Sequence, residues 1–197
     1  MRYSSDHKAE TRDRVLKEAA KEIRAKGPDN VAVSGIMARA GLTHGGFYAH
    51  FPSKDALVKE AIGTMFADAR ARTEQIDASG DPRGVLRAYV DFYLSPAHRD
   101  RRDRGCPLPT LSGDFARARP ETRDRFGLGV VGIATRLAAP LAKLGYADPD
   151  AEAHALLAQL VGSVALARAV GDAALSDALL ADTHASIVAR YGLETAQ

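Results

Sequence analysis

The sequence has a single cysteine, little excess charge and no long apolar run, and each shortage argues against a class of protein. With only Cys106, the 197-residue chain cannot form an intramolecular disulfide. A net charge of +2 is too small for the whole chain to bind nucleic acid as a polyelectrolyte. No charge-free apolar run reaches about 18 residues, the length of a membrane span, and the N-terminus lacks an apolar signal segment. We therefore expect a soluble, cytoplasmic protein.

The side-chain patterns of enzymes and metal proteins are also missing from the sequence. It shows no Ser-His-Asp constellation, no phosphate-binding glycine loop in a strand context and no paired carboxylate pocket, so we predict a protein without catalytic activity or cofactor. The histidines at 98, 154 and 184 have no metal-ligand spacing with one another or with Cys106. A metal site is therefore not expected.

What the chain does have is helical periodicity interrupted by glycine and proline. Hydrophobic residues make up 46%, which is enough for a packed core. Because β-branched alternation is scarce, we predict an all-α fold of about nine helices. Ser34, Thr43 and Ser53 are placed to cap three of them. The expected helices cover residues 8–26, 34–40, 44–50, 54–76, 82–94, 110–118, 120–144, 150–171 and 175–191.

Residues 33–57 carry the most informative pattern. They indicate a short helix, a tight turn at Gly41, which can adopt a left-handed conformation, and a second short helix that ends in an aromatic cluster. This is the layout of a helix-turn-helix, which inserts its second helix into the major groove of DNA. Residues 1–60 hold 11 Lys and Arg against 8 Asp and Glu, whereas the remainder holds 16 against 17. The modest positive excess therefore lies where DNA phosphates would be.

Residues 10–60 resemble the tetracycline-repressor (TetR) family of bacterial transcription regulators. The resemblance implies a helix-turn-helix DNA-binding domain over residues 1–54 and a helical effector-binding and dimerisation domain over residues 55–197. It also implies a homodimer on a palindromic double-stranded operator, and we predict a repressor released by a small-molecule or thiol-reactive effector. An activator, or a DNA-associated interaction module without a ligand response, is the alternative. The segments that carry the resemblance are residues 11–20, Gly27, residues 36–41 and residues 46–57.

The predicted DNA contacts lie on the second short helix and its flanks. By resemblance, His44 is the candidate reader of bases, and several neighbours contact phosphates. Gly45 has no side chain and would let the backbone approach the duplex, although the family often has a polar residue there. Lys54, at a helix N-terminus, could address a phosphate together with free N–H groups. The full set is Ser34, Thr43, His44, Gly45, Gly46, Tyr48, His50 and Lys54.

Each of these assignments has a structural alternative. Phe47 and Phe51 are expected to be core residues that hold the short helices together. Tyr48 suits either the core or the DNA. His50 could interact with a helix dipole instead of a phosphate, and Lys54 could be a solvated charge.

The effector-binding residues are harder to locate because aromatic residues in helices also suit a core. We single out a set that could line a pocket, while core packing explains each member equally well. The set is Tyr89, Phe92, Tyr93, Cys106, Leu111, Phe115, Phe126 and His154.

Cys106 permits two interpretations. Arg101, Arg102 and Arg104 precede it, and nearby cations lower the pKa of a thiol and favour the reactive thiolate. The Gly-Cys-Pro-Leu segment also resembles a subgroup of the family in which a cysteine senses electrophiles or oxidants. The alternative is an unreactive, half-buried cysteine that acts as a small hydrophobe.

The last two expected helices supply the predicted dimer interface. A two-fold symmetric dimer would present two DNA-reading heads to two half-sites. Small residues between 155 and 166 would allow close helix approach, and apolar residues between 179 and 188 continue the surface. The same stripe suits an intramolecular core, and we expect it to serve both purposes on different faces.

Overall fold

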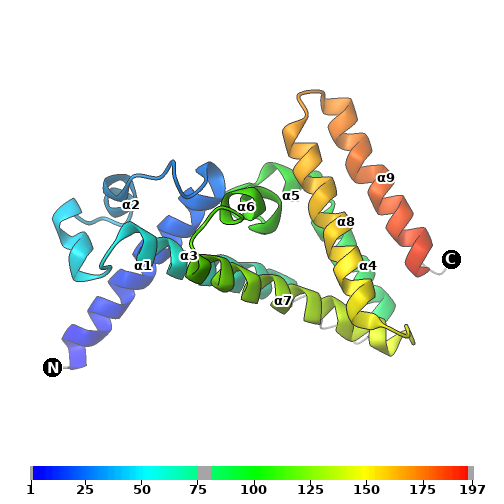
Figure 1. Cartoon of the computed structure of the whole chain (residues 1–197), viewed down its shortest axis with the longest axis horizontal. Helices are drawn as coiled ribbons and strands as arrows, with labels where there is room; N and C mark the ends of the chain where they lie inside the picture. The colour runs from blue at the N-terminus through cyan, green and yellow to red at the C-terminus, as the bar shows by residue number, and fades with distance from the viewer. Residues whose placement is uncertain (1, 75–80, 195–197) are drawn as a thin grey trace.

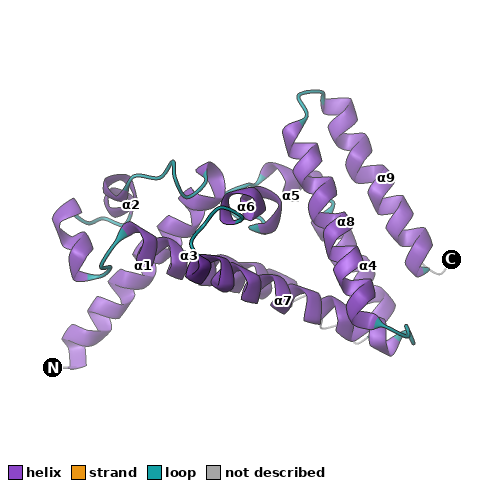
Figure 2. Ribbon diagram, viewed as in Figure 1, coloured by secondary structure: helices purple, strands orange, loops and turns teal. Residues whose placement is uncertain are grey.

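The computed structural model describes residues 2–74 and 81–194, and these residues form helices and connecting loops without a strand (Figure 2). The predicted all-α fold is therefore confirmed. The described elements are nine α-helices and one 3-10 helix: α1 (Arg2–Lys26), α2 (Val33–Arg39), η1 (His44–Ala49), α3 (Lys54–Glu74), α4 (Pro82–Tyr93), α5 (Pro96–Asp100), α6 (Leu108–Phe115), α7 (Pro120–Lys143), α8 (Pro149–Ala169) and α9 (Ala173–Tyr191).

Helix α5 and the 3-10 form of η1 were not expected from the sequence. The pair Ser95-Pro96 suggested a break, but Ser95 accepts a hydrogen bond from the amide of His98 (3.1 Å) and caps a new short helix. A serine cap followed by proline at the first helical position starts a helix as readily as it ends one. Residues 75 and 76, expected at the end of the fourth helix, lie outside the described residues.

The predicted helix caps had different outcomes. Ser53 caps α3 as predicted, with Oγ accepting from the amide of Ala56 (3.1 Å). The prediction for Ser34 was wrong, because α2 already begins at Val33 after Ala32 and Ser34 lies inside its first turn. Thr43 stands at the cap position of η1 but its side chain accepts no capping hydrogen bond. The Gly41 turn has the expected left-handed backbone, with φ of 74°.

The N-terminal helices pack around one end of α1. Val15, Ala19 and Ile23 form a fully buried stripe on α1 at helical spacing. Ile36 and Met37 of α2 are buried in the same core. Helix α3 packs along α1, and the short helices α2 and η1 lie at the end of the molecule remote from α9 (Figure 1).

The C-terminal helices form a second layer that α3 joins to the first. Helix α3 packs against both α1 and α7, α7 packs against α8, and α8 packs against α9 (Figure 1). Among the described helices, α7 is long and apolar enough by composition to cross a membrane. It contacts α3, α4, α6 and α8, and 33% of its apolar segment is buried, with Leu128 and Val131 on its exposed face.

Candidate DNA-binding surface and effector cavity

Two buried phenylalanines fix the short helix η1 to the rest of the N-terminal region. Phe47 and Phe51 stack with ring centroids 5.8 Å apart and are both buried, as predicted for core residues. The guanidinium of Arg12, on α1, lies 4.7 Å from the centre of the Phe51 ring and forms an ion pair with Glu60 of α3. A two-turn element that could not hold itself together is thereby attached to two long helices.

The predicted DNA contacts remain on the surface. Tyr48 is 70% exposed, with only an edge of its ring against Phe47 (5.2 Å between centroids). Of the other predicted contacts, Ser34, Thr43, His44 and Gly45 are exposed, and Gly46, His50 and Lys54 are partly exposed.

Two of the predicted DNA contacts, Lys54 and His50, have surroundings within the chain that bear on their role. The Lys54 ammonium donates a hydrogen bond to the carbonyl oxygen of Asp29 (3.1 Å), which ties the start of α3 to the loop between α1 and α2. The Nδ1 atom of His50 is buried and has no hydrogen-bond partner among the described residues. Lys54 is therefore not simply a solvated charge.

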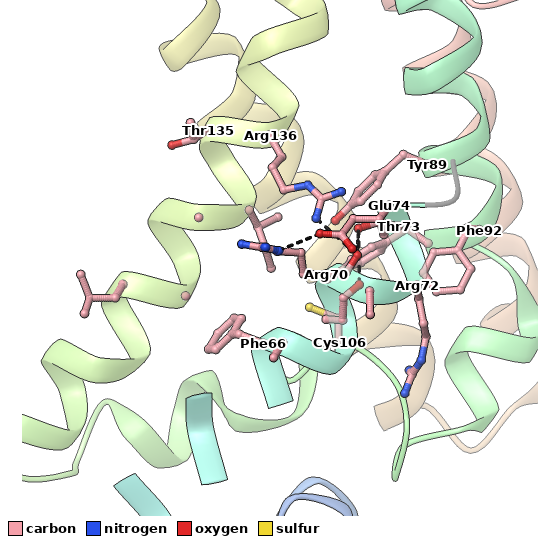
Figure 3. Close-up of a pocket in the computed structure, with 18 residues that line it drawn as sticks. Phe66, Arg70, Arg72, Thr73, Glu74, Tyr89, Phe92, Cys106, Thr135 and Arg136 are labelled. Carbon is pink, nitrogen blue, oxygen red and sulfur yellow. Dashed lines mark hydrogen bonds and ion pairs between the residues drawn. The ribbon is translucent and has the colours of Figure 1, made fainter. Parts of the chain in front are cut away.

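A cavity of about 710 Å³ lies between α3, α4 and α7. That volume falls in the range of sites for drug-sized ligands, roughly 300–1,000 Å³. Its wall is largely apolar, with Phe66 from α3 and three aromatic residues from α4. Arg70 and Glu74 form an ion pair on α3 (2.9 Å), and Arg136 of α7 donates to the carbonyl oxygen of Arg70 (3.4 Å). Figure 3 shows this polar group on one side of the cavity, with Phe66 and the sulfur of Cys106 on the other.

The structure separates the eight effector candidates into three groups. Tyr89, Phe92, Tyr93 and Cys106 line the cavity. The other apolar candidates belong to the hydrophobic core, and the histidine lies on the exposed side of α8. Those residues are Leu111, Phe115, Phe126 and His154.

The sequence did not indicate that α3 and α7 contribute residues to the cavity wall. The α3 side of the wall includes Phe66 and several charged residues. These lie more than 50 positions along the chain from the lining residues of α7. One signal was available in the glycines at 127, 129 and 132 of α7, which are uncommon inside helices. A Cβ atom at Gly129 would overlap the ring of Phe66, so this glycine permits the close approach of α3 and α7.

Burial, not the flanking arginines, controls the Cys106 thiol. Cys106 is buried, and burial raises the pKa of its thiol above the ordinary value, with Tyr93 and the more distant Arg168 and Arg24 only partly opposing this. The expectation that the preceding arginines lower the pKa is therefore wrong. Arg101, Arg102 and Arg104 are exposed, and Arg102 donates to the carbonyl oxygen of Arg168 (3.0 Å), so water screens their charges from the thiol.

A buried histidine joins the cavity wall to the next loop. Nδ1 of His98 is hydrogen-bonded to the carbonyl oxygen of Tyr93 (2.6 Å), and Nε2 accepts from the amide of Cys106 (3.0 Å). Since Nε2 accepts, the proton of the neutral ring belongs on Nδ1. Burial lowers the pKa of His98 to about 4, although the hydrogen bond to Tyr93 opposes the shift. His98 therefore stays neutral at physiological pH.

Two arginines attach helix α5 and the loop after it to distant helices. On one side, Arg168 of α8 donates to the carbonyl oxygens of His98 and Arg99 (both 2.9 Å). On the other side, Arg24 of α1, only 1% exposed, donates from Nε to the carbonyl oxygen of Asp103 (2.7 Å). The loop that carries Cys106 therefore contacts the cavity, the N-terminal region and α8 at once.

Comparison with known proteins places the N-terminal region in a family. Residues 15–61 match the family of bacterial regulatory proteins, tetR family. The chain is also 39% identical over 67 residues to an uncharacterised HTH-type transcriptional regulator, YdgC, of Bacillus subtilis (strain 168). Residues 15–61 therefore have the sequence pattern of the N-terminal region of the TetR family. The match to YdgC spans about a third of each protein, 34% in both cases, and lies well short of their full lengths.

Solved structures show that nearly the whole chain has a known fold. A TetR-family transcriptional regulator from Cytophaga hutchinsonii superimposes with a TM-score of 0.79 at 18% identity, covering 97% of this chain and 98% of that one. A TetR-family regulator from Agrobacterium tumefaciens gives 0.78 at 21% identity, covering 93% and 98%. At these identities the likeness shows only the arrangement of helices. What the cavity binds has to be argued from the residues of this chain.

The part of the chain that the structure describes holds no group of three or more His, Cys, Asp or Glu side chains placed to bind a metal ion.

Proposed function

We propose that the protein is a homodimeric transcription repressor that binds a palindromic DNA operator and is released from it by a small molecule held in the cavity. The observation that carries the DNA-binding role is the contrast within η1. Phe47 and Phe51 anchor the helix, while Tyr48 and His44 are left exposed on a family-matched reading head. Proteins of this family are generally transcription factors, not enzymes.

The boundary between the two functional regions is proposed at the start of α3, between residues 54 and 55. Lys54 opens α3 beside the reading head, and Glu74 ends the described part of the same helix at the cavity. A single helix of 21 residues, about 30 Å long at 1.5 Å per residue, therefore runs from one region to the other. Movement of its cavity end would be transmitted to the reading head as a rigid rotation.

The proposed dimer interface uses the outer faces of α8 and α9. Leu156, Leu180 and Ile187 are buried within the chain and serve its core. The opposite side of α8 leaves Leu166 56% exposed, and Leu175 at the start of α9 is 50% exposed. Exposed apolar side chains beside small residues such as those at 155 and 158 support a close helix–helix contact between two copies.

Release is proposed to follow from linkage between the cavity and the reading head. A ligand that prefers the conformation with lower DNA affinity weakens DNA binding, and DNA weakens ligand binding by the same factor. The contacts of Arg24 with Asp103, next to the cavity wall, supply a physical connection from the cavity to α1. Helix α3 supplies the second connection.

The proposed function is tested first by selecting bound fragments from a random DNA library. We expect a palindromic motif with two half-sites about one or more helical turns apart. Binding of the selected operator is then compared for Tyr48→Ala, His44→Ala and Lys54→Ala. Loss of a specific base contact weakens operator binding by about 1–3 kcal/mol, and loss of a phosphate contact lowers the salt slope by about one.

Matched variants keep this test specific. His154→Ala removes an exposed histidine from α8, and Lys143→Ala removes an exposed lysine at the end of α7. Both are expected to bind the operator like the parent protein. Because Lys54 also bonds to Asp29, the thermal midpoint of Lys54→Ala is measured alongside. Recovery of no motif, or equal affinity for the motif and for random DNA, would overturn the proposal.

A further inference from the structure

We propose that the cavity between α3, α4 and α7 selects an uncharged ligand with an apolar, aromatic body. This inference rests on the proposed function and names the ligand class of the same cavity. Three observations carry it. The charged groups at the cavity are engaged within the chain or turned away, the polar groups deeper in the wall are bonded within the chain, and aromatic rings and glycines shape the space that remains.

The charged side chains among the described lining residues offer a ligand no free counter-charge. Arg70 forms an ion pair with Glu74 (2.9 Å), and Arg136 donates to the carbonyl oxygen of Arg70 (3.4 Å). Figure 3 shows these three side chains together on one side of the cavity. Arg72 extends away from them, towards a separate surface hollow that it lines together with Asp68. A charged ligand would therefore find each of these groups already engaged or turned away.

The ion pair of Arg70 and Glu74 also lies on the solvent side of the cavity. Both side chains are more than half exposed, so water screens their charges. A charged ligand would gain only a screened attraction from this pair, yet it would lose part of its own hydration on entering the apolar interior. An uncharged ligand avoids that loss. The balance therefore favours a neutral molecule over both an anion and a cation.

The polar side chains deeper in the wall are bonded within the chain. The hydroxyl of Tyr93 and the sulfur of Cys106 are hydrogen-bonded to each other, and the amide of Leu108 donates to the same sulfur. The buried hydroxyl of Thr73 donates to the carbonyl oxygen of Arg70 (3.0 Å). Because these groups are already paired, they need neither a donor nor an acceptor from a ligand. An apolar body can therefore cover them without leaving them unsatisfied.

Aromatic rings supply much of the remaining wall. Phe66 of α3 lines the cavity together with Tyr89 and Phe92 of α4. Tyr89 stacks on Tyr93 with ring centroids 5.7 Å apart, and Phe66 meets Phe126 edge-on at 5.5 Å. These neighbours hold the rings in place, so a ligand meets a preformed aromatic surface. Stacking and edge contacts with such rings favour an aromatic ligand over a sugar or a nucleotide.

Two glycines of α7 leave room for such a body. Gly132 lines the cavity, and a Cβ atom there would meet nothing within 4 Å. At Gly129 a Cβ atom would overlap the ring of Phe66, so this glycine lets the ring approach α7. Leu128, which is 64% exposed, continues the apolar lining to the outer surface of α7. The remaining volume of about 710 Å³ is large enough for a two-ring compound.

The test uses three probes that share one ring system and carry heads of similar size. 2-Naphthylmethanol is uncharged, 2-naphthoate is an anion and 2-naphthylmethylammonium is a cation. Because the chain has no tryptophan, naphthalene fluorescence is followed against tyrosine alone. Dissociation constants are measured for the full-length protein at neutral pH and matched ionic strength. We expect the alcohol to bind about tenfold or more tightly than either charged probe, because only the charged heads lose strong hydration on entry.

Variants connect the preference to the cavity. Gly132→Leu places an apolar side chain in the open space at the lining, and we expect it to weaken binding of the alcohol about tenfold. Gly127→Leu is the matched control, since a Cβ atom at Gly127 also meets nothing within 4 Å but this glycine of α7 is not among the described lining residues. Phe66→Leu keeps the wall apolar and removes one ring, so we expect the alcohol to bind about threefold more weakly. Thermal midpoints verify that every variant is folded.

The outcomes separate this inference from the proposed function. The inference of an uncharged ligand is overturned if a charged probe binds as tightly as the alcohol, if no probe binds up to millimolar concentration, or if Gly132→Leu and Gly127→Leu bind the alcohol equally well. Operator affinity is measured on the same samples without probe. A parent protein that prefers the alcohol but binds no DNA motif would count against the repressor proposal alone. Operator binding without that preference would count against the ligand class alone.

Discussion

Arg24 on α1 and Asp103 in the loop before Cys106 are joined by a partly buried hydrogen bond, 2.7 Å from the guanidinium Nε to the carbonyl oxygen. The same guanidinium forms an ion pair with Asp68 of α3 (3.1 Å). Residues 79 positions apart therefore connect the helix that supports the reading head to the wall of the cavity.

Replacing Arg24 with methionine is expected to lower the free energy of unfolding by about 1–3 kcal/mol, because the carbonyl of Asp103 and the carboxylate of Asp68 both lose their partner. The variant should also respond less to a cavity ligand, since one connection to α1 is cut. Urea unfolding measures the first effect and operator release the second. Arg14→Met, at an exposed position of the same helix, serves as the control. If Arg24→Met keeps the parental stability and the parental release from the operator, this contact contributes to neither property.

Two glycines on α7 are expected to respond to alanine in opposite directions. At Gly132 a Cβ atom meets nothing within 4 Å, so Gly132→Ala should stabilise the helix by about 0.5–1 kcal/mol. At Gly129 the Cβ atom would overlap the ring of Phe66, so Gly129→Ala should destabilise by about 1–3 kcal/mol. Denaturant midpoints of the two variants provide the comparison. Stabilisation by both substitutions would contradict the close packing of α3 against α7.

The buried neutral His98 predicts a loss of stability in mild acid. Its pKa falls from 6.5 in the unfolded chain to about 4 in the fold, so between these values the unfolded chain binds more protons than the folded one. The contribution is fully present above pH 6.5 and is lost as the pH falls to about 4, amounting to about 3 kcal/mol. Urea unfolding from pH 4 to pH 7 measures this slope.

Two variants test whether the acid-dependent loss of stability comes from His98 or from general acid denaturation. His98→Gln should be less stable at neutral pH and should lose most of the slope between these pH values. His154→Gln, at an exposed position of α8, should keep it. A His98→Gln protein with the full parental slope would assign the acid sensitivity to other groups.

Cys106 should react slowly with iodoacetamide at neutral pH. Burial raises the pKa of its thiol and blocks access, so we expect alkylation about tenfold or more below the rate of the same chain in denaturant. Mass spectrometry follows a single added group because the chain has one cysteine. Cys106→Ser should bind the operator normally and remain unlabelled. Equal rates in the folded and denatured chains, with operator release in the parent only, would support a thiol-reactive effector instead of a non-covalent one.

Several features could be predicted from the sequence because they depend on short stretches of chain. The helix-turn-helix follows from the spacing around Gly41 and from the aromatic cluster after it, and the cap at Ser53 follows from one side chain and one amide. The missed helix α5 shows the limit of such local signals. Ser-Pro is compatible with both the end and the start of a helix, and only the packing of the buried His98 determines which occurs.

The all-α fold and the DNA-reading head were determined by the sequence itself, because helical periodicity, caps and turns act over a few residues. The cavity, the state of Cys106 and the Arg24 connection were decided only in the tertiary structure. They depend on α1, α3, α4 and α7 meeting across more than 50 residues, and on burial, which reverses the pKa shift that the neighbouring arginines alone would produce.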